Sequence, residues 1–155
     1  MTDYINEMQT VILAGGLATR LGDLTKDNPK SMLKILGKPF MEYQLESLRA
    51  GGIEDIVICL GHLREQIESY FGDGREHGVN IRYSYEDNLL GTAGALKKAE
   101  PLLGDIFFTM YGDSYLFLDF AADENLVAVL PCLIKQSDDF INGIYRDSLG
   151  NLPYL

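Results

Sequence analysis

The chain has 155 residues, of which 46% are hydrophobic, and a formal net charge of −10. This length suits one domain with a packed core, and the composition excludes a disordered chain. No run reaches the roughly 18 apolar residues of a membrane span, and the acidity argues against nucleic acid, whose phosphates need a broad basic face. The polar opening residues lack a signal-peptide pattern. Cys59 and Cys132 lie in apolar runs without partner spacing, so we expect reduced thiols and a cytoplasmic location.

Strands and helices are predicted to alternate along the chain. Apolar runs predict three of the strands, and alternating apolar residues from 79 to 85 predict another. Apolar residues at 41, 45 and 48 predict a helix that Gly51-Gly52 closes. The predicted elements are strands 11–14, 56–60, 79–85 and 106–111 and helices 40–49, 63–71 and 91–103. Strands at 126–134 and 141–145 and a turn at 148–151 are also expected. This order predicts a three-layer, Rossmann-like α/β domain over residues 1–155, with a mostly parallel central sheet.

In such a sheet, ligands bind beyond the carboxyl ends of the strands. This edge would hold Gly15, the residues after Tyr85, and Asp113. Five basic and two acidic residues lie between positions 15 and 38, so the positive charge is local and an anionic ligand is expected beside the first strand.

Gly15 and Gly16 directly follow the first strand, where bare backbone N–H groups can cradle phosphate oxygens. An ordinary turn also favours glycines, and neither the P-loop nor the dinucleotide-binding spacing is present. Arg20 adds a planar fork for phosphate, and Lys30 a compact charge. Either could be a solvated surface cation, but Pro29 restricts the loop that carries Lys30. Lys26, Lys34 and Lys38 are expected to be solvated.

Asp113 follows a buried strand and Gly112, which suits a Mg²⁺ ligand, although a turn-forming aspartate is the alternative. Glu86 ends the third strand and precedes the small residues Gly91, Ala93 and Gly94. These small residues would let a flat base approach the backbone. The alternatives are helix–sheet packing for them and a surface carboxylate for Glu86.

The combined motifs resemble the sugar-phosphate nucleotidyltransferases, also called NDP-sugar pyrophosphorylases. The resemblance is strongest to the bacterial branch with D-glycero-α-D-manno-heptose 1-phosphate guanylyltransferase. The matching motifs are Leu13-Ala14-Gly15-Gly16, Thr19-Arg20-Leu21, Pro29-Lys30, Gly37-Lys38-Pro39-Phe40 with Glu42-Tyr43, Gly72-Asp73-Gly74, Leu90-Gly91-Thr92-Ala93-Gly94 and Gly112-Asp113.

The resemblance implies a Mg²⁺-dependent reaction in which an NTP and a sugar 1-phosphate give an NDP-sugar and pyrophosphate. It implies that Arg20 holds the leaving phosphates, that Lys30 neutralises the α-phosphate and the sugar phosphate, and that Asp113 binds Mg²⁺. The implied contacts with the nucleotide come from Leu13, Ala14, Gly15, Gly16, Glu86, Gly91 and Thr92. A carboxylate at Glu86 mildly favours GTP, because it can accept the N1–H and N2–H₂ of guanine, but it could also accept a uracil or thymine N3–H.

The chain departs from the family at Ala18, Ser31 and Tyr111, where glycine, proline and asparagine are frequent. It is also shorter than usual family members, so we expect a truncated form that lacks most of the sugar contacts. The alternative to an enzyme is therefore a nucleotide- or nucleotide-sugar-binding module without turnover. A glycosyltransferase is disfavoured because Asp113-Ser114-Tyr115 lacks a second aspartate. Apolar surface left by a missing part would favour a homo-oligomer.

Overall fold

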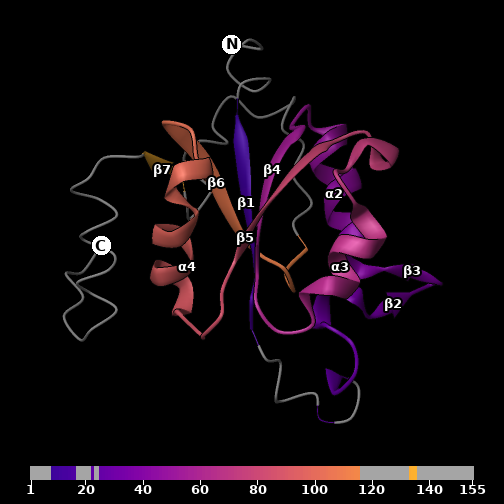
Figure 1. The fold of residues 1–155 in the computed structure, drawn as a ribbon. Coiled ribbons are helices and arrows are strands. Elements are labelled where there is room, and N and C mark those ends of the chain that lie inside the picture. The colour runs from indigo at the N-terminus through magenta and orange to yellow at the C-terminus, as the bar shows by residue number, and fades with distance from the viewer. Residues whose placement is uncertain (1–7, 17–21, 23–24, 116–132, 136–155) are drawn as a thin grey trace.

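A parallel sheet forms the centre of the structure (Figure 1). The computed structural model describes residues 8–16, 22, 25–115 and 133–135. Within these residues, the sheet has the strand order β5-β4-β1-β6-β7. Its strands are β1 (Gln9–Ala14), β4 (Asp55–Leu60), β5 (Asn80–Tyr85), β6 (Ile106–Tyr111) and β7 (Leu133–Lys135). All neighbouring strands pair in parallel except β7, which runs antiparallel to β6.

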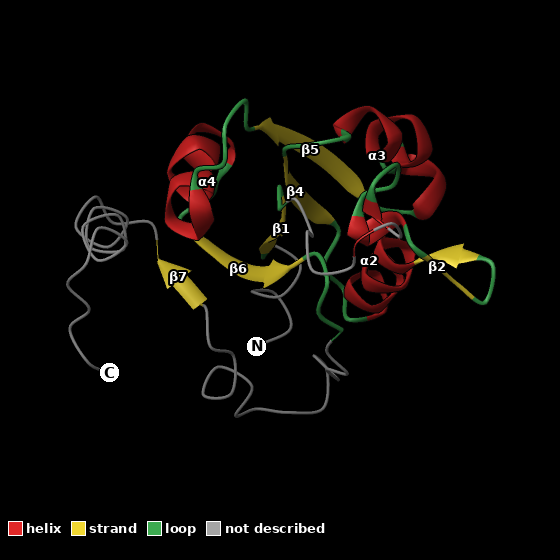
Figure 2. Ribbon diagram, turned by 90° about the horizontal axis from the view of Figure 1, so that it is seen from below, coloured by secondary structure: helices red, strands yellow, loops and turns green. Residues whose placement is uncertain are grey.

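Helices cover both faces of this sheet, with α4 on one side and α2 and α3 on the other (Figures 1 and 2). The helices are α2 (Phe40–Ala50), α3 (Arg64–Phe71) and α4 (Gly91–Ala99), with short 3₁₀ helices η2 (Lys30–Met32), η3 (Arg75–His77) and η4 (Glu100–Leu102). The predicted three-layer α/β architecture with a mostly parallel sheet is thereby confirmed. None of the described helices has the length and apolar character needed to cross a membrane.

Two hydrophobic cores lie on the two faces of the sheet, because successive side chains of a strand point to opposite sides. Ile12 of β1 and Ile58 of β4 belong to the core with α2 and α3, whereas Val11 belongs to the core with α4. Burial on both faces explains why β1 and β4 appear in the sequence as continuous apolar runs, whereas β5 alternates. Cys59 is a buried free cysteine, as predicted, and burial raises the pKa of its thiol to about 12.

The predicted helix at 91–103 was too long. The α-helical hydrogen bonding ends at Ala99, and the chain tightens into η4, which has Pro101 in its first turn. A proline lacks the N–H that an α-helix interior requires, so it favours this change. The predicted strand 126–134 overlaps β7 at its end, and the rest of it, strand 141–145, the turn at 148–151 and Cys132 lie outside the described residues.

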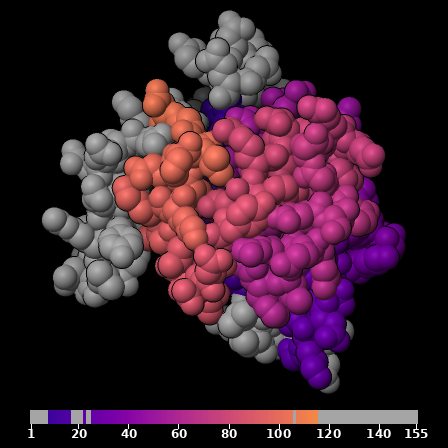
Figure 3. All heavy atoms as spheres, in the orientation of Figure 1, coloured from indigo at the N-terminus to yellow at the C-terminus, as the bar shows by residue number. Residues whose placement is uncertain are grey.

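A small hairpin projects from the body of the molecule (Figures 1 and 3). Its strands are β2 (Lys34–Ile35) and β3 (Lys38–Pro39). Leu36 at its turn is 96% exposed and has a left-handed backbone with a φ of 51°. Lys38 is less solvated than predicted, because its Nζ donates to Glu46 at 2.6 Å and lies 4.1 Å from the centre of the Tyr43 ring.

The hairpin turn gives a stability prediction. Left-handed backbone costs a leucine about 1 kcal/mol, and asparagine tolerates it better. Because the Leu36 side chain is exposed, Leu36→Asn removes little packing and should raise the free energy of unfolding by about 1 kcal/mol. Urea denaturation measures this change. Ile35→Asn, at a residue outside the left-handed region, is the control and should give no gain; equal effects of the two substitutions would contradict the explanation.

Candidate functional site

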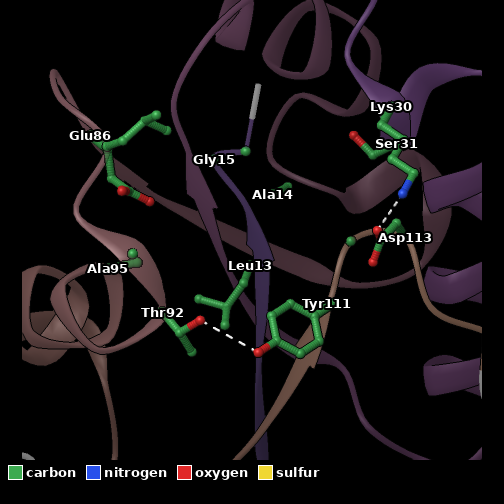
Figure 4. Close-up of a pocket in the computed structure, with 14 residues that line it drawn as sticks. Leu13, Ala14, Gly15, Lys30, Ser31, Glu86, Thr92, Ala95, Tyr111 and Asp113 are labelled. Atoms are coloured by element: carbon green, nitrogen blue, oxygen red, sulfur yellow. Dashed lines mark hydrogen bonds and ion pairs between the residues drawn. The ribbon is translucent and has the colours of Figure 1, made fainter. Parts of the chain in front are cut away.

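A pocket opens at the carboxyl edge of the sheet (Figure 4). Its volume is about 560 Å³, which is in the range of small-molecule sites. It is lined by Leu13, Ala14, Gly15, Gly16, Lys30, Ser31, Glu86, Leu89, Gly91, Thr92, Ala95, Tyr111, Gly112 and Asp113. Nine of the ten predicted site residues are among these, and the tenth, Arg20, lies outside the described residues. The structure thus brings together segments that are far apart in the sequence.

Gly15 directly follows β1 and lies close to Glu86. A Cβ at Gly15 would lie 2.5 Å from Glu86 Oε1, so the Glu86 carboxylate could keep its place only beside a glycine. A Cβ at Gly61, which follows β4, would lie 2.6 Å from the Gly15 carbonyl oxygen. Gly61 therefore lets the two strand ends come together. The sequence analysis missed this contact, and the only signal was a glycine directly after the neighbouring strand.

Glu86 is part of the pocket wall. The residue is only 9% exposed. Its backbone N–H donates to the Leu60 carbonyl at 2.7 Å, and its Oε2 accepts the Leu90 N–H at 3.2 Å. Burial raises the pKa of the Glu86 carboxyl group, while the Leu90 N–H and the Lys98 ammonium act in the opposite direction. The alternative of a surface carboxylate is therefore wrong. The carboxylate faces the pocket beside Gly15 (Figure 4).

An ion pair lies at the other end of the pocket. Lys30 Nζ lies 2.5 Å from Asp113 Oδ2, and the two side chains are 41% and 40% exposed. The hydrogen bond from Lys30 lowers the pKa of the Asp113 carboxyl group, so this carboxyl group is ionised at neutral pH. Figure 4 shows this pair across the pocket from Glu86. The pocket therefore has a cation-bearing end and a carboxylate end.

The residues at Asp113 fit the expected Mg²⁺. The described part of the chain contains no group of three or more histidine, cysteine, aspartate or glutamate side chains that could hold a metal. Asp113 already accepts a cation, the Lys30 ammonium, on the pocket side. Mg²⁺ is commonly held by one or two carboxylates together with phosphate oxygens and waters. One carboxylate that faces a pocket suits this way of binding.

The third wall of the pocket comes from the start of α4. Gly91, with a φ of 68°, Thr92 and Ala95 line it, and Thr92 Oγ1 lies 3.4 Å from the Tyr111 hydroxyl oxygen. Ala93 and Gly94 are buried in packing instead, and a Cβ at Gly94 would lie 2.7 Å from Leu90 Cβ. The packing alternative is therefore right for Ala93 and Gly94, whereas Gly91 faces the pocket.

Several lining residues were not predicted as site residues. Ser31 and Tyr111 stood out only as departures from the family, and Ala95 did not stand out at all. Ser31 is 3% exposed, and its hydroxyl has no hydrogen-bond partner within the described part of the chain. A sequence signal did exist for Ala95, because it lies three and four residues after Thr92 and Gly91 and so shares their helix face.

A sheet covered on both faces, with a pocket at its carboxyl edge, defines a Rossmann-like α/β protein. The nucleotidyl transferase family model matches residues 9–130 of this chain. The chain therefore belongs to the nucleotidyl transferase family, and the resemblance predicted from its motifs is confirmed.

Curated relatives carry nucleotidyltransferase names. The chain is 44% identical over 124 residues to a UTP–glucose-1-phosphate uridylyltransferase of Synechocystis, covering 72% of this chain and 32% of the relative. It is 35% identical over 133 residues to a D-glycero-alpha-D-manno-heptose 1-phosphate guanylyltransferase of Campylobacter jejuni. This match covers 86% of this chain and 60% of the relative. The chain thus spans less than two thirds of the length of either relative.

Solved structures agree with this relationship. HddC from Yersinia pseudotuberculosis, in a crystal structure complexed with GMP-PN, superposes with a TM-score of 0.68 at 32% identity. The match covers 80% of this chain and 55% of that one. The crystal structure of a Bacillus anthracis protein named a putative glucose-1-phosphate thymidylyltransferase matches with a TM-score of 0.64 at 33% identity. This match covers 68% of this chain and 44% of that one.

The buried carboxyl group gives a pH prediction. Because its pKa is raised in the folded protein, Glu86 costs stability once the pH rises through that pKa, and this cost is absent below the ordinary value near 4.5. Glu86→Gln should therefore raise the free energy of unfolding at pH 7, and the gain should disappear near pH 4. Denaturant titrations at the two pH values test this. The exposed Glu54→Gln is the control; a Glu86→Gln gain independent of pH would contradict the assignment.

Proposed function

We propose that this protein is a Mg²⁺-dependent sugar-1-phosphate nucleotidyltransferase. In this reaction, an oxygen of the sugar phosphate bonds to the α-phosphorus of an NTP. The bond from that phosphorus to the bridging oxygen breaks, and pyrophosphate leaves. The observation that carries the proposal is the polarity of the pocket, with the Glu86 carboxylate at one end and Lys30 with Asp113 at the other. A nucleotide has the complementary polarity, because its base can donate hydrogen bonds and its phosphates are anionic.

The residues at the phosphate end neutralise and orient the reacting groups. The backbone N–H groups at Gly15 and Gly16 are proposed to bind phosphate oxygens, since neither residue has a side chain in the way. The Lys30 ammonium is proposed to leave Asp113 and to pair with the α-phosphate and the sugar phosphate. Arg20 is proposed to hold the β- and γ-phosphates. Phosphoryl transfer depends mainly on such positioning and charge neutralisation, because the protein forms no covalent bond itself.

Asp113 is the residue proposed to hold Mg²⁺. When bound there, the ion would supply positive charge to the phosphate oxygens. Because Asp113 and Lys30 form an ion pair, each side chain holds the other in the pocket. The ammonium and the carboxylate are thus held in place before the reactants bind.

Glu86 is proposed to recognise the base, with GTP as the favoured nucleotide. One carboxylate oxygen accepts the Leu90 N–H, and the carboxylate has capacity for further donors. Guanine presents two adjacent donors, N1–H and N2–H₂, and this match supports GTP. The guanylyltransferase relative and the HddC complex with GMP-PN support it as well. The uridylyltransferase relative supports the alternative, a uracil or thymine N3–H on one oxygen.

A second candidate function is binding of a nucleotide or nucleotide sugar without turnover. The chain spans only 32% to 60% of the two relatives compared above, so the comparisons bear on part of each of those enzymes. The pocket that is present suits the nucleotide half of the substrates.

One assay separates these functions. Pyrophosphate release is measured with GTP, UTP, CTP and dTTP, each with a panel of sugar 1-phosphates and Mg²⁺, and calorimetry measures nucleotide binding in parallel. We expect release with at least one pair, fastest with GTP. Binding without release would establish the binding module, and neither binding nor release with any nucleotide would rule out both functions.

The two proposed phosphate cations give a mutational prediction. Lys30→Ala and Arg20→Ala should each weaken triphosphate binding by about 1.5–3 kcal/mol, which is the usual contribution of a charge-assisted hydrogen bond. Calorimetric titration with GTP measures the change. The control is Lys26→Ala, because Lys26 is exposed and does not line the pocket. Unchanged GTP affinity in the Lys30 and Arg20 variants would count against the proposal.

A further inference from the structure

A glutamine occupies a core position of α2. The apolar face of this helix carries Met41, Leu45 and Leu48, all buried, and Gln44 lies on the same face with only 1% of its surface exposed. An amide in such a place costs free energy unless it is hydrogen-bonded. An apolar side chain of similar volume would avoid this cost. The partners of Gln44 therefore indicate why an amide stands there.

Both donors of the Gln44 amide point at backbone carbonyls. Nε2 lies 2.9 Å from the Tyr111 carbonyl oxygen and 2.6 Å from the Ser114 carbonyl oxygen. Carbonyl oxygens can only accept, so the nitrogen, and not the oxygen, of the amide must face them. Gln44 Oε1 has no partner within the described part of the chain. The side chain thus acts through its two donated hydrogen bonds.

The two carbonyls belong to the first and last residues of one tight turn. The Ser114 N–H donates to the Tyr111 carbonyl at 3.2 Å, which closes a four-residue turn, and Asp113 is its third residue. The Gly112 N–H donates to the Leu13 carbonyl at 2.9 Å and ties the turn to β1. Gln44 therefore holds the base of the turn that carries Asp113.

The same helix also anchors the partner of Asp113. The N–H of Phe40, the first residue of α2, donates to the Leu33 carbonyl at 3.0 Å, and the Leu33 N–H donates to the Lys30 carbonyl at 3.2 Å. Lys30 and Asp113 are 83 positions apart in the sequence and form an ion pair. Helix α2 is thus a common support for both halves of this pair.

We propose that Gln44 is a positioning residue that fixes the Asp113 carboxylate in the pocket. This inference rests on the proposed function, because the position of Asp113 matters for the ligands that Asp113 is proposed to bind. With Gln44 in place, the turn is held in one geometry. The Asp113 carboxylate is then already oriented for the cation that it binds. Without the two donors, both carbonyls lose a buried partner, and the turn is free to rearrange around Gly112.

The chain provides a matched control for this proposal. Gln9 is also buried, at 3% exposure, and its Nε2 also donates to a backbone carbonyl, that of Leu102 at 3.2 Å. Its Oε1 accepts the Gly104 N–H at 3.0 Å. Gln9 starts β1, at the opposite end of the strand from the pocket. A methionine replaces either glutamine with similar length and no donor.

The experiment compares Gln44→Met with Gln9→Met by two measurements. Amide hydrogen exchange at Ser114 is followed without ligand, and Mn²⁺ binding in the presence of GTP is followed by electron paramagnetic resonance. We expect Gln44→Met to speed the Ser114 exchange and to weaken Mn²⁺ binding about tenfold, as is usual when a residue that orients a metal ligand is removed. The GTP affinity measured in EDTA should stay within about twofold of wild type, because the substitution weakens binding of the metal and not of the nucleotide. Gln9→Met should lower the melting temperature and change neither measurement.

Wild-type Ser114 exchange or wild-type Mn²⁺ affinity in folded Gln44→Met would overturn the proposal, and so would an equal loss in Gln9→Met. If Gln44→Met does not fold, Gln44→Asn replaces it, because the shorter amide cannot span both carbonyls. If wild-type protein binds neither GTP nor Mn²⁺, the proposed function fails. The hydrogen-exchange comparison still decides whether Gln44 holds the turn.

Discussion

The parallel pairing of β1 with a strand on each side is the constraint on which the site depends. It puts the carboxyl ends of β1, β4 and β6 at one edge, with Leu13 level with Cys59 and Tyr111. A glycine follows each of these ends. A Cβ at Gly61 would meet the backbone of Gly15, and a Cβ at Gly112 would meet the side chain of Ala14. The edge is therefore closely packed, yet it presents bare backbone to the pocket.

Charge is distributed in the pocket in a way that the overall composition conceals. The chain has a net charge of −10, but the pocket pairs one lysine with one aspartate at one end and buries a glutamate at the other. At the first end, the ion pair lowers the pKa of Asp113; at the second, burial raises the pKa of Glu86. Two carboxyl groups in one pocket thus differ in proton affinity because their surroundings differ.

Much of the fold could be predicted because β1 and β4 are buried on both faces, so that each appears as an apolar run that ends at a glycine, while β5 shows as an alternation of apolar and polar residues. The pocket residues followed from the rule that parallel strands share a carboxyl edge, and this rule placed Gly15, Glu86 and Asp113 correctly. What escaped prediction depends on tertiary contacts. Gln44 looks like an ordinary polar helix residue, and its partner Tyr111 is 67 positions away. Equally, nothing local pairs Lys30 with Asp113.

The strand order also bears on synthesis of the chain. The central strand β1 is made first, β4 is its partner on one side, and β6 on the other side is made last of the three. Until residue 111 has left the ribosome, one edge of β1 has unpaired N–H and C=O groups along an apolar strand. Such an edge can pair with other chains. The arrangement that gives the finished protein its pocket therefore makes the nascent chain prone to aggregation until β6 is in place.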